Sequence, residues 1–119
     1  MTEEGKRLPA VFFRTQTGRE PVREWLQSLD KESRRLIGAD IKTVEYGWPI
    51  GMPLCRSIGT GVWEVRCKLS GNRIARVLFC IHEEHLVLLH GFIKKSRALP
   101  KADLDLAYER KSQLEEGSS

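Results

Sequence analysis

Apolar and polar residues alternate along the second half of the chain with the two-residue period of β-strands. The clearest stretch, from residue 61 to 101, contains β-type runs joined by short turns, and Pro100 near its end is placed to open a helix. A short apolar run near the N-terminus also reads as a strand. The pattern predicts strands at residues 10–14, 54–58, 62–69, 73–81 and 86–95.

The residues between the first and second predicted strands follow a helical period instead. Pro21 suits the first position of a helix, where its missing N–H is not needed. The apolar residues that follow share one helical face: Val22, Trp25, Leu26 and Leu29. Asp30 is a favourable N-cap for a second helix, which Gly47 ends. A third helix is expected at residues 100–114.

The order of these elements predicts an α+β fold. It consists of an N-terminal strand, an αα-hairpin, a four-stranded, mostly antiparallel meander and a C-terminal helix. With 119 residues the chain forms a single domain, residues 1–119. The termini, residues 1–9 and 115–119, are polar and are expected to be flexible.

Composition favours a cytoplasmic protein. Cys55, Cys67 and Cys80 are odd in number and lack metal-ligand spacing, so neither a disulfide nor a zinc site is expected. This cysteine usage fits a reducing compartment. No apolar run is long enough to cross a membrane, and the N-terminus lacks a signal-peptide pattern. No carboxylate or histidine cluster suggests a metal, so no cofactor is expected.

Positive charge is concentrated in the predicted meander. The formal net charge of the chain is +4. Residues 54–101 contain nine Lys and Arg against three Glu, so this segment alone carries +6. Solvated surface residues would account for many such charges. Arginines inside strands, at Arg66 and Arg76, are less ordinary and favour an anionic partner.

The turn between the third and fourth predicted strands decides whether these arginines meet. A three-residue turn at 70–72 pairs Arg66 with Arg76, whereas a two-residue turn puts them on opposite faces. We prefer the first, because it gathers Trp63 and Val77 on one apolar face. A two-residue turn at Glu83-Glu84 then places Gly91 opposite Arg76.

On this register, His90 and Phe92 share the apolar inward face, while Glu64 and Lys95 share the arginine face. Like charges directly opposite each other destabilise a sheet unless an anion lies between them. Gly91 would leave room for that anion. The alternatives are that Glu64 pairs with one arginine while solvent covers the other, and that His90 is a core histidine.

Three segments carry a resemblance to a known family: VWEVR, RIARVLF and LLHGFIKKSRALP. Together they resemble the RelE/HigB superfamily of toxins from type II toxin–antitoxin systems, in its phage-derived, HigB-like branch. The resemblance implies a RelE-like fold and a ribosome-dependent endoribonuclease that cuts mRNA. It also implies a cognate helix-turn-helix antitoxin.

The resemblance also assigns residues. The basic residues that hold the scissile phosphate fall on Arg66 and Arg76, and the basic pair ending the last strand falls on Lys94 and Lys95. Some members of the superfamily use a tyrosine near the C-terminus or C-terminal histidines and acidic residues. Neither Tyr46 nor Tyr108, both on predicted helices, clearly fits that role, so the general base stays open.

These residues suggest metal-independent RNA cleavage, in which the 2′-hydroxyl attacks the adjacent phosphate. The arginines would hold the phosphate, and Lys95 or Lys94 would neutralise charge or protonate the leaving oxygen. Either Glu64 or His90 could be the base. The other basic residues of the segment are assigned to RNA binding: Arg56, Lys68, Arg73 and Arg97. The alternative is a non-catalytic protein that binds nucleic acid or only its antitoxin.

Overall fold

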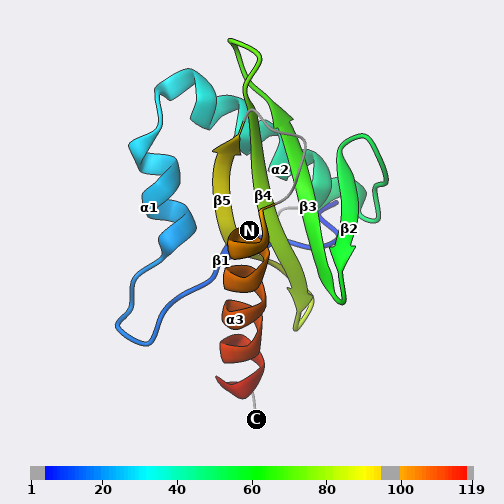
Figure 1. Ribbon diagram of the computed structural model, residues 1–119. Helices are drawn as coiled ribbons and strands as arrows, with labels where there is room; N and C mark the ends of the chain where they lie inside the picture. Colours follow the sequence, from blue (N-terminus) through cyan, green and yellow to red (C-terminus); the bar gives the residue numbers. More distant parts are fainter. Residues whose placement is uncertain (1–4, 95–99, 118–119) are drawn as a thin grey trace.

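The computed structural model describes residues 5–94 and 100–117 (Figure 1). Within these ranges the chain forms five strands and three helices. In order, they are β1 (Ala10–Phe12), α1 (Pro21–Ser28), α2 (Lys31–Gly47), β2 (Cys55–Gly59), β3 (Val62–Lys68), β4 (Ile74–His82), β5 (His85–Lys94) and α3 (Lys101–Gly117).

The α+β class is confirmed, but the sheet differs in detail from the prediction. It is one mixed five-stranded sheet with the order β1-β5-β4-β3-β2, rather than a four-stranded meander beside a separate N-terminal strand. β1 pairs with β5 in parallel, and the other pairs are antiparallel. Residues 86–89 of β5 are buried, so β5 would make a poor exposed edge, and β1 covers it.

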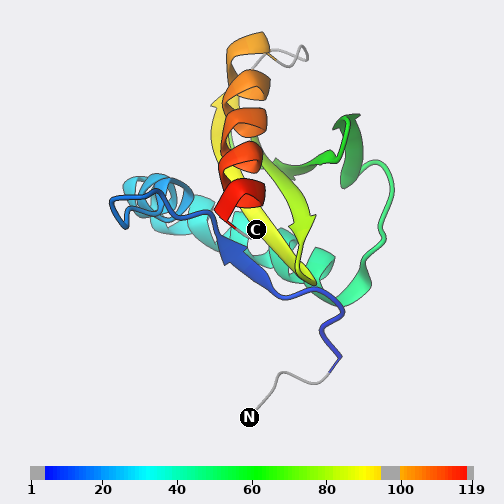
Figure 2. The same ribbon diagram turned by 90° about the horizontal axis from the view of Figure 1, so that it is seen from below.

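Helices cover both faces of the sheet (Figure 2). α1 packs on β5 and α2 on β3, while α3 lies against β4 and β5 on the opposite face. We call these faces the α1/α2 side and the α3 side. The apolar core on the first includes Val22, Ile37, Val65, Val77 and Phe79. The core on the second includes Phe13, Leu78, Val87, Leu89 and Ala107.

Local sequence signals set the helix starts as predicted. Pro21 is the first residue of α1. The side chain of Asp30 caps α2, accepting a hydrogen bond from the Ser33 N–H at 3.1 Å. The bonds from Ser33 lower the pKa of the Asp30 carboxyl, which fits an anion at a helix N-terminus. The last helix, α3, is longer than predicted and continues to Gly117.

The three-residue turn between β3 and β4 is confirmed. The Leu69 N–H donates to the Arg73 carbonyl over 2.9 Å, and Arg66 pairs directly with Arg76. Positive φ angles in the turn, at Gly71 and Asn72, suit residues that adopt the left-handed region readily. The side chains of Arg66 and Arg76 therefore start from the same face of the sheet.

The uniform register expected between β4 and β5 is wrong. Starting at the hairpin turn, the observed pairs match the expected register as far as Phe79, which lies opposite Leu88. The next pair is Leu78 with His90, so Leu89 is an additional residue on β5. Such a β-bulge shifts every later residue of its strand by one position.

The bulge exchanges the faces of the β5 residues beyond it. Arg76 lies opposite Phe92 instead of Gly91. His90 and Phe92 therefore lie on the α3 side with Arg76, although the pattern predicted them on the inward face with Val77. Gly91 faces the opposite way, against Trp25, so it does not provide the space beside Arg76 that the pattern predicted for an anion.

Arg110 of α3 holds the bulge in place. Its Nη1 donates to the Leu89 carbonyl over 2.7 Å, and its guanidinium lies 5.9 Å from the centroid of the Phe13 ring. Burial lowers the pKa of the Arg110 guanidinium. Since a bulge leaves the extra residue without its ladder bonds, this side chain supplies a missing partner from 21 residues further along the chain.

We expect Gly91→Ala to destabilise the fold by about 1–3 kcal/mol. The added Cβ would lie 2.4 Å from the Cε3 and Cζ3 atoms of Trp25, too close for either residue to keep its position. Gly38→Ala is the matched control, because nothing lies within 4 Å of its added Cβ on α2. That variant should gain about 0.5–1 kcal/mol. Urea unfolding measures both changes, and a neutral Gly91→Ala would contradict the bulged register.

The three thiols are free and buried. Burial raises the pKa of Cys55 and of Cys80 to about 11. It also raises the pKa of Cys67, and the nearby Asp40 carboxylate adds to the effect. The thiols are therefore protonated and unreactive near neutral pH. No helix within residues 5–94 and 100–117 has both the length and the apolar character needed to cross a membrane.

Candidate active site

Four charged residues meet on the α3 side of the sheet, and we call them the arginine–glutamate cluster: Arg56, Glu64, Arg66 and Arg76. Adjacent strands supply them. Arg56 of β2 lies opposite Glu64 of β3, and Arg66 of β3 lies opposite Arg76 of β4. Strand alternation places all four on one face. Three arginines and one glutamate leave the cluster with a net charge of +2.

Glu64 is the centre of the cluster. Its Oε1 lies 3.2 Å from the Arg56 Nε and 3.8 Å from the Arg66 Nε. Its Oε2 lies 3.7 Å from the Arg76 Nη1. The carboxylate thus lies between three guanidinium groups, and it offsets the repulsion between the paired arginines.

Burial divides the cluster into an inner and an outer part. Glu64 and Arg76 are essentially inaccessible, with relative exposures of 0% and 1%. The side chains of Arg56 and Arg66 keep 36% and 30% of their exposure. A solvent-borne anion can therefore reach the outer arginines, whereas the inner pair is sealed. Glu64 is a buried counter-ion for the arginines, because charges that are removed from water must be compensated by nearby charges of opposite sign.

His90 stands next to the cluster on the same face. It pairs with Leu78, which in turn pairs with Glu64, so the three occupy one row across the sheet. The His90 Nε2 lies 2.6 Å from the Asp103 Oδ1, and both side chains are largely buried. The imidazole also stacks on Phe92, with 5.4 Å between ring centroids. Its orientation is therefore fixed from two sides.

Asp103 comes from the first turn of α3, where a carboxylate is favoured by the helix dipole. Asp103 therefore interacts favourably with the dipole of α3 and also binds His90 of β5. A hydrogen-bonded carboxylate selects the tautomer and orientation of an imidazole, which suits a histidine for proton transfer. Asp103 was not among the residues that the sequence pattern singled out. Its place in the first turn of a helix was visible, but the contact with β5 was not.

The structure brings some of the predicted site residues together and separates others. Arg56, Glu64, Arg66 and Arg76 meet, with His90 adjacent. Lys68 is exposed at the end of β3. Arg73 is turned toward α2, where its Nη2 lies 3.4 Å from the Ser33 Oγ. The backbone of Lys94 pairs with Ile74. Lys95 and Arg97 lie outside the described residues.

The family described as "Phage derived protein Gp49-like (DUF891)" matches residues 24–112. The chain belongs to this family. The matched region of this Gp49-like chain runs from α1 into α3 and contains the whole arginine–glutamate cluster, His90 and Asp103. No curated protein matches the chain significantly.

The side chains of the site offer groups for anion binding and for proton transfer. Among residues 5–94 and 100–117 of this Gp49-like chain, no three His, Cys, Asp or Glu side chains come close enough to hold a metal ion together. His90 and Asp103 form a pair, and Glu64 faces cations. The chemistry available from these groups is anion binding and proton transfer.

Proposed function

We propose that this Gp49-like chain is the toxin of a type II toxin–antitoxin pair and acts as a metal-independent, ribosome-associated endoribonuclease that cleaves mRNA. The family is toxin-like, of the RelE/HigB type, which supports the broad assignment. The observation that carries the proposal is the net positive cluster, held around a buried carboxylate and placed beside an oriented histidine. Anion binding and proton transfer are the two functions that metal-free phosphodiester cleavage needs.

Arg66 and Arg56 would bind the scissile phosphate. Both guanidinium groups are partly exposed, and a planar guanidinium matches two phosphoryl oxygens at once. Negative charge on these oxygens grows in the transition state, so cations already in place stabilise it without reorganising. Arg76 would stabilise the same negative charge electrostatically from its buried position. Glu64 would keep the arginines in position.

His90 would act as the general base. It would take the proton from the 2′-hydroxyl, whose oxygen then forms a bond to phosphorus while the bond from phosphorus to O5′ breaks. The products would be a 2′,3′-cyclic phosphate and a 5′-hydroxyl. Asp103 would hold the imidazole in the orientation that accepts this proton. Glu64, the other residue that the sequence suggested as a base, is less suitable because neither substrate nor water reaches it.

Lys95 or Lys94 would donate the proton that O5′ requires. Lys94 ends β5, three residues beyond Gly91, on the strand that also carries His90. Lys68, Arg73 and Arg97 are assigned to contacts with RNA outside the reacting phosphate. The proposed partners are mRNA, the ribosome and a neutralising antitoxin, in the cytoplasm.

Arg66→Ala tests the proposal with the least risk to folding, because the Arg66 side chain is partly exposed and Arg76 is not. The wild type and the variant would be expressed from a tightly controlled promoter, with growth followed and new 5′-hydroxyl ends mapped on cellular mRNA. Arg34→Ala is the matched control, since Arg34 is exposed on α2, on the other side of the sheet.

The wild type and Arg34→Ala should arrest growth and generate cut sites, while Arg66→Ala should lose cleavage by a factor of about 10² or more. Unchanged cleavage by Arg66→Ala would reject the assigned site. A folded wild type that binds RNA but produces no cut ends would reject the nuclease and favour a non-catalytic binder. Coexpression with the protein encoded by the neighbouring reading frame should restore growth if that protein is the antitoxin.

A further inference from the structure

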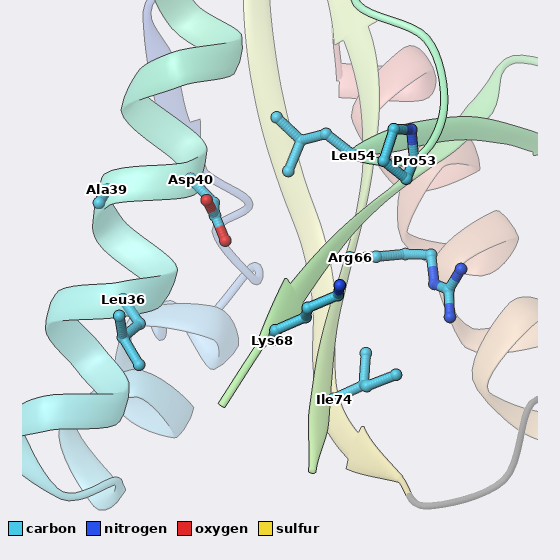
Figure 3. A pocket seen from close by; sticks show the side chains of 8 residues that line it. All are labelled: Leu36, Ala39, Asp40, Pro53, Leu54, Arg66, Lys68 and Ile74. Atoms are coloured by element: carbon cyan, nitrogen blue, oxygen red, sulfur yellow. The ribbon is translucent and has the colours of Figure 1, made fainter. Parts of the chain in front are cut away.

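Leu89 and His90 are neighbours in β5, yet both side chains lie on the α3 side of the sheet. Leu89 belongs to the apolar core on that side, and the His90 Nε2 lies 2.6 Å from the Oδ1 of Asp103 in α3. In a regular strand successive side chains point to opposite faces, so only the bulge places both on one face. This is also the face toward which the Arg66 side chain points, away from α2 (Figure 3). The bulge therefore brings the imidazole to the arginine–glutamate cluster.

One face of α3 contacts both of these residues. Asp103, Ala107 and Arg110 follow one another at the spacing of positions on one face of a helix, and Ala107 is fully buried. Asp103 binds the imidazole, as described above. The Arg110 Nη1 donates to the Leu89 carbonyl over 2.7 Å. Leu89 is fully buried, so water cannot replace this donor if the Arg110 side chain is removed.

Trp25 disfavours the regular register from the other side of the sheet. Without the bulge, His90 would lie opposite Val77, in the position that Gly91 occupies. A Cβ added at Gly91 would lie only 2.4 Å from ring atoms of Trp25, so an imidazole does not fit there. Arg110 thus favours the bulged register, and Trp25 blocks the regular one. Without Arg110, β5 loses the donor at its bulge and can regain a regular ladder only by displacing Trp25.

We propose that Arg110 is a positioning residue for His90. Its hydrogen bond to the Leu89 carbonyl fixes the bulge, and the bulge sets where the imidazole lies relative to the cluster. Arg110 does not contact the RNA and acts only through His90. Its effect on cleavage rests on the proposed function, in which His90 is the general base. Its effect on the position of the imidazole does not rest on that function.

Arg110→Met tests the proposal, because methionine keeps an apolar stem but lacks the donor. NMR spectra of the wild type should show cross-strand proton contacts between Leu78 and His90 and the proximity of the imidazole to Asp103. Both should weaken in Arg110→Met. With mRNA in a purified translation system, kcat should fall by a factor of about 10–10² with little change in KM. The base is then misplaced, whereas the arginines that bind the phosphate are unchanged.

Three further variants complete the test, and unfolding midpoints establish which of them are folded. Arg110→Lys should keep most of the NMR contacts and part of kcat, because an ammonium group can donate to the same carbonyl. Arg110→Gln has a shorter side chain that does not reach the carbonyl, and it repeats the test if Arg110→Met does not fold. Lys101→Met is the matched control, since it removes the same charge from an exposed position of α3 and should behave like the wild type.

Unchanged NMR contacts in folded Arg110→Met or Arg110→Gln would overturn the proposal, whatever the rate of cleavage. Equal losses in Lys101→Met would also overturn it, because the charge of α3 would then be the cause. Displaced contacts with normal cleavage would support Arg110 as the residue that positions His90 and would reject His90 as the general base. If the wild type does not cleave RNA, the proposed function fails, and the NMR contacts still decide whether Arg110 positions His90.

Discussion

Glu64→Gln should lower the free energy of unfolding by about 3–5 kcal/mol, the largest stability change expected for this chain. The substitution keeps the volume of the side chain and removes the carboxylate charge that lies between three guanidinium groups. Arg76 is 1% exposed and cannot turn to water for compensation. Urea unfolding followed by circular dichroism gives the change as a shift in midpoint at constant slope.

Glu109→Gln is the matched control, because Glu109 is exposed on α3. It should change the free energy of unfolding by less than about 0.5 kcal/mol. The double variant Glu64→Gln/Arg76→Met should recover part of the loss, since it removes the buried positive charge together with the carboxylate charge that faces it. Equal effects of Glu64→Gln and Glu109→Gln would mean that the cluster does not stabilise the fold as its burial indicates.

Local signals in the sequence were enough to predict the helices and strands and about half of the candidate active site. Alternation located the strands of the meander to within one or two residues, because each strand has a buried face that fixes its period. The turn at 70–72 followed from the same logic, since only an odd loop gathers the apolar residues of β3 and β4 on one face. That turn brings Arg66 opposite Arg76, which is the framework of the arginine–glutamate cluster.

Long-range pairing was beyond the reach of the pattern. The Leu89 bulge depends on Arg110, a residue of α3 that donates to the Leu89 carbonyl from a distant part of the chain. Nothing in the local alternation of β5 marks the position, because residues 86–89 are apolar on both sides of the strand. The parallel addition of β1 is similar, since a three-residue strand carries no signal for its partner.

The same limit affected the chemistry. The pattern predicted an open arginine face, with an anion between the two paired arginines. In the structure Glu64 reaches both arginines and Arg56 as well, so a side chain of the protein takes the inner position. His90 lies on the same face as the cluster only because of the bulge, and Asp103 contacts His90 only because α3 packs against the sheet.

His90→Ala should reduce RNA cleavage by about 10²–10⁴, the contribution typical of a general base. The imidazole lies on the same face as the cluster and is oriented by Asp103 at 2.6 Å and by Phe92. The measurement is the initial rate of cut-site formation in a purified translation system. Added imidazole should restore part of the activity of His90→Ala, because a free base can enter the space that the side chain leaves. A purely structural role would give no such rescue.

A substitution at Asp103 tests the orientation of His90 separately from proton transfer by His90. Asp103→Asn should lower kcat with little change in KM, because the amide still fills the position but no longer favours the same imidazole tautomer. Added imidazole should not restore Asp103→Asn, since His90 still occupies the site. Lys101→Gln, exposed two residues earlier on α3, is the control and should cleave at the wild-type rate. If His90→Ala cleaves normally while Arg66→Ala does not, the cluster binds the phosphate and another group accepts the proton. The assignment of His90 as the general base would then be wrong, and the assignment of the phosphate-binding cluster would stand.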